Sequence, residues 1–153
     1  MTSGDLARAA LLIDECLAVF RELRDEFHTG WVLRSLALLQ RERGEIPNAR
    51  ISAYEGLRLF HARNDVTGVL FFLSILARLS LDVGEVERGL RLAGATRSLQ
   101  ISSGADLVGA SYSFAGSAWD DELERLGPDA GRIWAAGARM TMDDAVSYAL
   151  RAE

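Results

Sequence analysis

Residues 44–83 of this 153-residue chain read GEIPNARISAYEGLRLFHARNDVTGVLFFLSILARLSLDV, and residues 4–43 align with them without a gap. Ten of the forty positions are identical, and they fall at helical spacings and at turns: Gly4/Gly44, Ala9/Ala49, Glu15/Glu55, Leu17/Leu57, Phe20/Phe60, Asp25/Asp65, Leu33/Leu73, Leu36/Leu76, Ala37/Ala77 and Leu39/Leu79. A period of this length is typical of helical arrays, in which each unit buries its apolar face against its neighbours. The sequence therefore predicts a stack of helix pairs that offers a surface rather than a built-in reaction centre.

The composition fits one domain spanning residues 1–153. Hydrophobic residues make up 49% of the chain and there are only two prolines, which favours long uninterrupted helices. A net charge of −5 argues against duplex nucleic acid as a direct partner. The sequence shows no leader peptide and no span long enough for a bilayer, so we expect a cytoplasmic protein without membrane contact. The single cysteine, Cys16, is on an apolar helix face and is expected to be a small core residue.

Apolar spacing and chain breaks predict seven helices, at about 5–25, 30–43, 47–63, 66–83, 85–101, 105–126 and 142–152. A turn is expected at 26–29 and a short connecting segment at 129–137. The helix at 66–83 is apolar nearly all round, which predicts a central position. Thr141 and Asp144 have the spacing of a capping box at the start of the last helix. These elements give repeat units at about 4–43, 44–83 and 84–104, followed by a C-terminal cap at about 105–153.

The repeat resembles the tetratricopeptide repeat in a form of about forty residues. The resemblance rests on the following residues of two units: Leu33, Leu36, Ala37, Gly44-Glu45, Ala49, Ala53 and Leu57, then Leu73, Leu76, Ala77, Gly84-Glu85, Gly89 and Ala93. It implies an all-α solenoid of antiparallel helix pairs closed by a C-terminal helical cap. Residues 4–25 then correspond to a second helix of a pair whose first helix would lie upstream.

Three later segments are similar to the end of large bacterial transcriptional regulators, in which a signal-transduction ATPase precedes tetratricopeptide repeats and a winged-helix or LuxR-type DNA-binding part lies elsewhere. These segments are 89–95, 122–127 and 134–146. The chain lacks a Gly-x-x-x-x-Gly-Lys-Ser/Thr loop and a recognisable DNA-reading helix, so neither ATP nor DNA binding carries over. The resemblance implies a non-catalytic protein- or peptide-binding module of a bacterial regulatory system, stand-alone or part of a larger regulator, without a cofactor.

By the same resemblance, the first helix of each pair would line a concave groove. The expected lining is Trp31, Arg34, Leu38 and Arg41 from one unit and Phe71, Ser74, Arg78 and Leu81 from the next. Three arginines and no acidic residue in an acidic chain favour an acidic peptide, a protein C-terminus or another anion. The alternative interpretation buries Trp31 and Phe71 between helices and leaves the arginines solvated or paired with Glu42 and Asp82.

Catalytic signals are weak. His28 in a turn and His61 near a helix end lack partners at metal-ligand or triad spacing, so both are interpreted as structural. The acidic run 120–124 is interpreted as a solvated face, and the Ser-Gly combinations at 102–104 and 116–117 lack the context of a nucleophile elbow. Trp119 and Trp134 are expected in the core of the cap.

Two further functions stay open at this point. The apolar face of the N-terminal helix would allow a twofold homodimer. A pocket between repeats and cap would allow a small-ligand sensor or an enzyme that uses Tyr112, Asp120 or Asp121, whereas Tyr112 and Phe114 would otherwise close one end of the groove.

Overall fold

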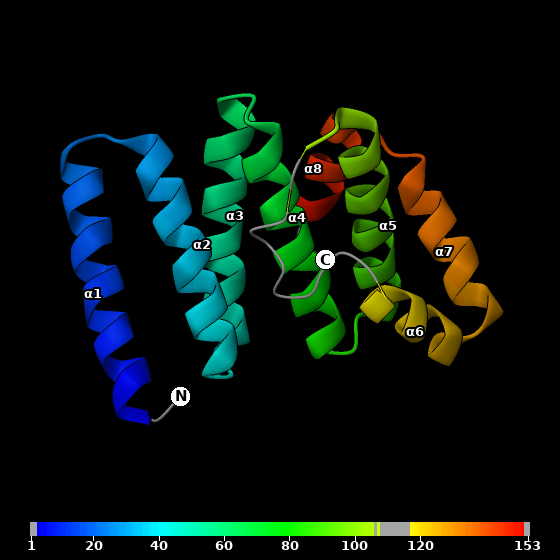
Figure 1. The fold of residues 1–153 in the computed structure, drawn as a ribbon, viewed down its shortest axis with the longest axis horizontal. Helices are drawn as coiled ribbons and strands as arrows, with labels where there is room; N and C mark the ends of the chain where they lie inside the picture. Colours follow the sequence, from blue (N-terminus) through cyan, green and yellow to red (C-terminus); the bar gives the residue numbers. More distant parts are fainter. Residues whose placement is uncertain (1–2, 106, 108–116, 152–153) are drawn as a thin grey trace.

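The computed structural model of the chain describes residues 3–105, 107 and 117–151, and the regular structure in these residues is entirely helical. Eight helices follow in order: α1 (Ser3–Glu22), α2 (Glu26–Glu42), α3 (Ile46–Ala62), α4 (Val66–Asp82), α5 (Val86–Ser103), α6 (Ser117–Leu126), α7 (Pro128–Ala138) and α8 (Met142–Leu150). The all-α prediction is confirmed. The helices form a row with α1 at one end and α7 at the other (Figure 1).

The turns that join the first five helices recur every twenty residues. In each turn an amide binds the carbonyl five residues earlier: Asp25 to Phe20 at 2.9 Å, Glu45 to Gln40 at 2.8 Å, Asp65 to Phe60 at 3.0 Å and Glu85 to Ser80 at 2.9 Å. The preceding residue is left-handed each time, which makes each turn a Schellman motif: Arg24, Gly44, Asn64 and Gly84. Three-residue turns reverse the chain, so consecutive helices are antiparallel neighbours.

Helices α2 and α4 each start with an aspartate cap. The carboxylate of Asp25 accepts a hydrogen bond from the His28 amide at 3.0 Å, and that of Asp65 accepts one from Gly68 at 2.9 Å. The backbone amide of His28, and then its ring, hold the pKa of the Asp25 carboxyl below its usual value. The predicted turn at 26–29 is therefore wrong: these residues are the first turn of α2, because Asp25 supplies the cap.

The left-handed turn positions make a testable prediction for stability. Arg24 has φ +55° and is exposed, so Arg24→Gly removes backbone strain and should raise the free energy of unfolding by about 0.5–1 kcal/mol. Gly44 has φ +74° and open space around its α-carbon, so Gly44→Ala should lower that free energy by about 1 kcal/mol. Urea unfolding followed by circular dichroism measures both. The two substitutions should change the free energy of unfolding in opposite directions. Changes of the same sign would contradict the left-handed conformation of these two turn residues.

The core is centred on α4 and on the ring of Phe60. Twelve residues of α4 are buried, which confirms the prediction for the helix at 66–83. Phe60 is fully buried in α3, and glycines on both sides make room for its ring: Gly30 on α2 and Gly68 on α4. A β-carbon on Gly30 would lie 2.7 Å from Phe60 Cε2. Small residues at these crossings allow the helices to approach closely.

The C-terminal part packs on α5 through two more glycines. A β-carbon on Gly94 of α5 would overlap the Trp134 carbonyl, and one on Gly137 of α7 would overlap the Arg91 carbonyl. The segment 129–137, expected as a connection, is therefore helix α7, and Pro128 occupies its first turn. Of the helix predicted at 105–126, the described residues contain Ser117–Leu126.

Helix α8 packs against α3, α4 and α5. Its capping box is confirmed by two 3.2 Å hydrogen bonds between Thr141 and Asp144. Asp143 lies 2.8 Å from the ring of His61 on α3, and the Arg88 guanidinium of α5 donates to the Ala149 carbonyl at 2.6 Å. The helix thereby joins α3 to α5, and Figure 1 shows it behind α4 and α5.

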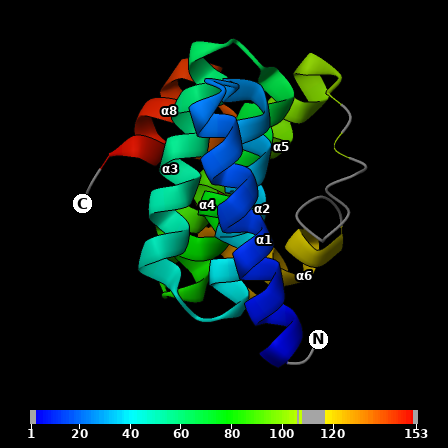
Figure 2. The ribbon, with the colours of Figure 1, turned by 90° about the vertical axis from the view of Figure 1, so that its left-hand side faces the viewer.

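Among the described helices, α1 has neighbours on one side only. Figure 2 shows it in front of α2 and α3, at the end of the row. Arg21 Nη2 donates to both carboxylate oxygens of Glu55, at 2.7 and 2.8 Å, and this ion pair joins α1 to α3. Leu17 is buried, but Leu12 and Cys16 are exposed. The expectation of a core cysteine is therefore wrong, because the periodicity reports an apolar face and not whether another helix covers it.

Candidate binding surface on α2 and α4

The aromatic residues of the predicted groove lie in contact with one another. The Trp31 ring of α2 lies 5.3 Å from that of Phe71 of α4 and 5.1 Å from that of Phe60, measured between ring centroids. Phe71 and Ser74 are buried, with exposed fractions of 9% and 7%, and Trp31 is half-buried. The alternative interpretation is thus correct for Phe71 but only in part for Trp31, and Ser74, which it did not include, is buried in the packing of α4 as well.

Arg34 differs from the other predicted groove arginines because it has no acidic partner within the described residues. Its guanidinium carbon lies 4.8 Å from the centroid of the Phe71 ring. Its Nε is buried and has no hydrogen-bond acceptor there. Burial lowers the pKa of Arg34, because desolvation disfavours the charged form. A permanent cation is therefore held against an aromatic face without a counter-ion from this part of the chain.

Arg41 and Arg78 share one acidic partner. The Asp82 carboxylate accepts from Arg41 Nε at 2.5 Å and from Arg41 Nη2 at 3.2 Å, and Arg78 Nε approaches it to 3.5 Å. The hydrogen bond to Asp82 raises the pKa of Arg41. The expectation that no acidic residue lies near these arginines is therefore wrong. The alternative interpretation, in which Asp82 pairs with them, is correct. Spacing gave the signal for one pair, since Arg78 and Asp82 are four apart on α4.

The two leucines of the predicted set occupy packing positions. Leu38 is half-buried and packs against the hydrophobic core. The side chain of Leu81 points toward α5, where a β-carbon on Gly89 would lie 2.7 Å from Leu81 Cδ2. Of the predicted groove lining, this leaves Trp31 and Arg34 as candidate binding residues, flanked by the ion-pair network of Arg41, Asp82 and Arg78.

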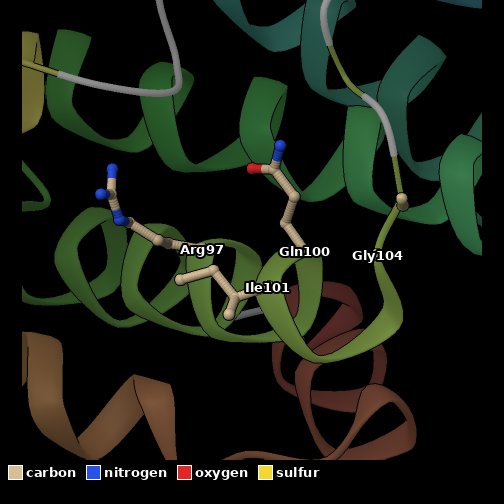
Figure 3. A pocket seen from close by; sticks show the side chains of 5 residues that line it. Arg97, Gln100, Ile101 and Gly104 are labelled. Carbon is tan, nitrogen blue, oxygen red and sulfur yellow. The ribbon is translucent and has the colours of Figure 1, made fainter.

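Hollows are also found among the described residues, and one of them shares Trp31 with this surface. One of about 300 Å³ opens between α1 and α2 and is lined by Leu12, Ile13, Cys16, Phe20, His28, Trp31, Val32 and Ser35. Another of about 350 Å³ lies where α5, α7 and α8 meet, beside Arg91, Arg139 and Arg151. The third, also about 350 Å³, lies at the C-terminal end of α5, where Arg97 and Gln100 project on the same side of the helix (Figure 3).

The described residues that were considered for chemistry lie in separate surroundings. His28 stacks on Phe20 at 5.0 Å and contacts Asp25 at 2.7 Å, while Asp120 and Asp121 are exposed. Trp119 is 4% exposed and lies 5.6 Å from Trp134, which confirms their place in the cap. Tyr112, Phe114 and the Ser-Gly pair at 116–117 fall wholly or partly outside the described residues.

Among the residues described, no three His, Cys, Asp or Glu side chains are grouped so that they could hold a metal ion. None of the described helices combines the length and apolar character needed to span a bilayer.

Comparisons with known protein families, with curated proteins and with solved structures gave no match to this chain. The resemblance to tetratricopeptide repeats and to regulator C-termini therefore rests on the residues of the chain itself.

Proposed function

We propose that the chain is a tetratricopeptide-like, non-catalytic binding module for an acidic peptide or protein segment, which it recognises through Trp31 and Arg34 on the α2–α4 face. The forty-residue recurrence of helix caps and turns supports the tetratricopeptide-like arrangement. Membership of a bacterial regulatory system is part of the proposal, supported by the three similar segments at 89–95, 122–127 and 134–146.

The single observation that carries this function is the state of Arg34. A guanidinium with a buried Nε, an aromatic face beneath it and no acidic partner in the described residues loses hydration without gaining an ion pair. A carboxylate from a ligand would supply the missing ion pair, because the guanidinium fork matches carboxylate geometry. Trp31 beside it supplies the aromatic area that anchors a peptide. Arg41 and Arg78 contribute a weaker field, since Asp82 already pairs with both.

The test uses peptide pairs in which each acidic peptide has a matched version with Asn and Gln in place of Asp and Glu. We expect acidic members to bind the wild-type chain at least tenfold more tightly than their neutral versions. Arg34→Glu should weaken acidic members by at least tenfold. Arg58→Glu is the matched control, because Arg58 is an exposed arginine on α3 and its reversal changes the net charge equally. If Arg34→Glu and Arg58→Glu weakened acidic-peptide binding equally, the effect would come from net charge alone, and the proposed site would be contradicted.

Arg34→Met separates binding from folding. The methionine keeps apolar contact with Phe71 and removes the desolvated charge, so the free energy of unfolding should stay within about 1 kcal/mol of the wild-type value or rise. Acidic-peptide binding should be lost in the same variant. Urea unfolding and fluorescence anisotropy measure the two quantities. A marked loss of stability with retained binding would show that Arg34 serves the fold and not a ligand.

A further inference from the structure

The hollow between α1 and α2 has a counterpart forty residues later in which the same positions are closed. Six of its lining residues are Leu12, Cys16, Phe20, His28, Trp31 and Val32. Their counterparts are Ser52, Gly56, Phe60, Gly68, Phe71 and Phe72, and all six are buried. The turn before α2 and the turn before α4 are the same Schellman motif with the same aspartate cap. Residues forty apart in these two units therefore occupy equivalent structural positions.

Side chains of α2 cover the counterpart of this hollow on α3 and α4. Trp31 packs on Phe60 and Phe71, and Gln40 accepts a hydrogen bond from Ser52 Oγ at 2.8 Å. At the outer edge, Arg41 pairs with Asp82. The α1–α2 pocket therefore lacks, within the described residues, the element that completes its counterpart: a helix crossing both of its walls.

We propose that the α1–α2 pocket binds an amphipathic helix of a partner protein that packs as α2 packs on α3 and α4. Its chemistry follows from the register. An aromatic residue would contact Phe20 and Trp31, and an arginine three positions later would lie over the Trp31 ring, as Arg34 lies over Phe71. A second arginine, ten positions after the aromatic residue, would meet the exposed carboxylate of Glu42, the counterpart of Asp82.

One position of the partner helix should differ from α2. Leu12 stands where the later unit has Ser52, so the partner side chain nine positions after the aromatic residue should be apolar instead of the hydrogen-bonding Gln40. Leu12 is 54% exposed, and an apolar contact there removes its side chain from water. The partner is thus an amphipathic helix with an aromatic residue, an arginine at the third following position and an apolar residue at the ninth.

The probe is a synthetic peptide with the sequence of residues 25–43, in its native form and with Gln40→Leu, added to the full chain. Cys16 is the only cysteine, is exposed and lines the pocket, so its rate of alkylation reports occupancy. We expect saturating peptide to slow alkylation at least tenfold, and the Gln40→Leu peptide to bind more tightly than the native one. A peptide in which Trp31 is replaced by alanine should give little protection.

Adjacent leucines of α1 provide a matched control in the protein. Leu12→Asp should weaken binding at least tenfold, whereas Leu11→Asp should leave it unchanged, because Leu11 is 65% exposed and does not line the pocket. Absence of protection, or equal loss in both variants, would overturn the proposal. A peptide-free dimer that Leu12→Asp dissociates would also overturn it and assign the pocket to a second copy of the chain. Protection of Cys16 in a longer form of the protein, by the upstream first helix that the repeat resemblance implies, would overturn it as well. Trp31 is common to both proposed sites but Arg34 does not line the pocket, so peptide protection of Cys16 should persist in Arg34→Glu, which separates this site from the proposed acidic ligand.

Discussion

Phe60→Ala should lower the free energy of unfolding by about 4 kcal/mol, one of the largest effects available to a single side chain of this protein. The ring is fully buried and contacts Trp31, Phe72 and Phe27, with centroid distances of 5.1, 5.9 and 6.2 Å. Alanine would leave a cavity where three helices meet, and neither α2 nor α4 can fill it, because each faces the ring with a glycine. Domains of this size are stable by roughly 5–15 kcal/mol, so most of the margin would be lost.

Phe27→Ala is the matched control for that experiment. Phe27 belongs to the same aromatic cluster but is 38% exposed, so we expect a loss of about 1 kcal/mol. Phe60→Leu keeps most of the volume and should cost about 1.5 kcal/mol. Urea unfolding at constant m value gives the comparison. A loss below about 2 kcal/mol for Phe60→Ala would mean that the neighbouring helices move to close the cavity. That result would contradict a rigid packing of Gly30 and Gly68 on the Phe60 ring.

The parts of the fold that local sequence controls were predicted well. Gly44 and Gly84 marked helix ends because the left-handed turn requires little more than the residue itself. Apolar residues all round the helix at 66–83 indicated a central helix, and Thr141 with Asp144 indicated the last helix start. In each of these cases the deciding interactions lie within a few residues of one another, or depend only on overall apolar character.

The errors share another cause, which is that the deciding partner lies far away in the sequence. Cys16 has the spacing of a core residue but is exposed, because nothing in the described chain packs on that side of α1. The segment 129–137 was expected as a connection, whereas it forms helix α7, in which Gly137 allows a close approach to the Arg91 carbonyl of α5. Arg34 and Arg41 looked equivalent on α2, yet only Arg41 meets an acidic residue, forty-one positions later. One-dimensional spacing cannot separate such cases.

The same substitution at two glycines of α7 should have opposite effects on stability. Gly137→Ala places a β-carbon on the backbone carbonyl of Arg91, and a backbone atom of a buried helix has no room to move. The crossing of α5 and α7 must then widen, at a cost of about 3 kcal/mol. Gly131→Ala meets nothing within 4 Å and improves helix propensity, so it should raise the free energy of unfolding by about 0.5–1 kcal/mol.

Tryptophan fluorescence separates local detachment of α7 from global unfolding. Trp119 and Trp134 pack together in the cap, and Trp31 lies in the repeat part, so Trp31→Phe leaves the cap as the only emitter. In that background Gly137→Ala should expose the two cap rings at a lower urea concentration than the one at which helical circular dichroism is lost. Gly94→Ala should act in the same way, because its β-carbon would meet the Trp134 carbonyl on the other side of the crossing. If both alanines were tolerated while Gly131→Ala destabilised, the close approach of α5 and α7 would be disproved.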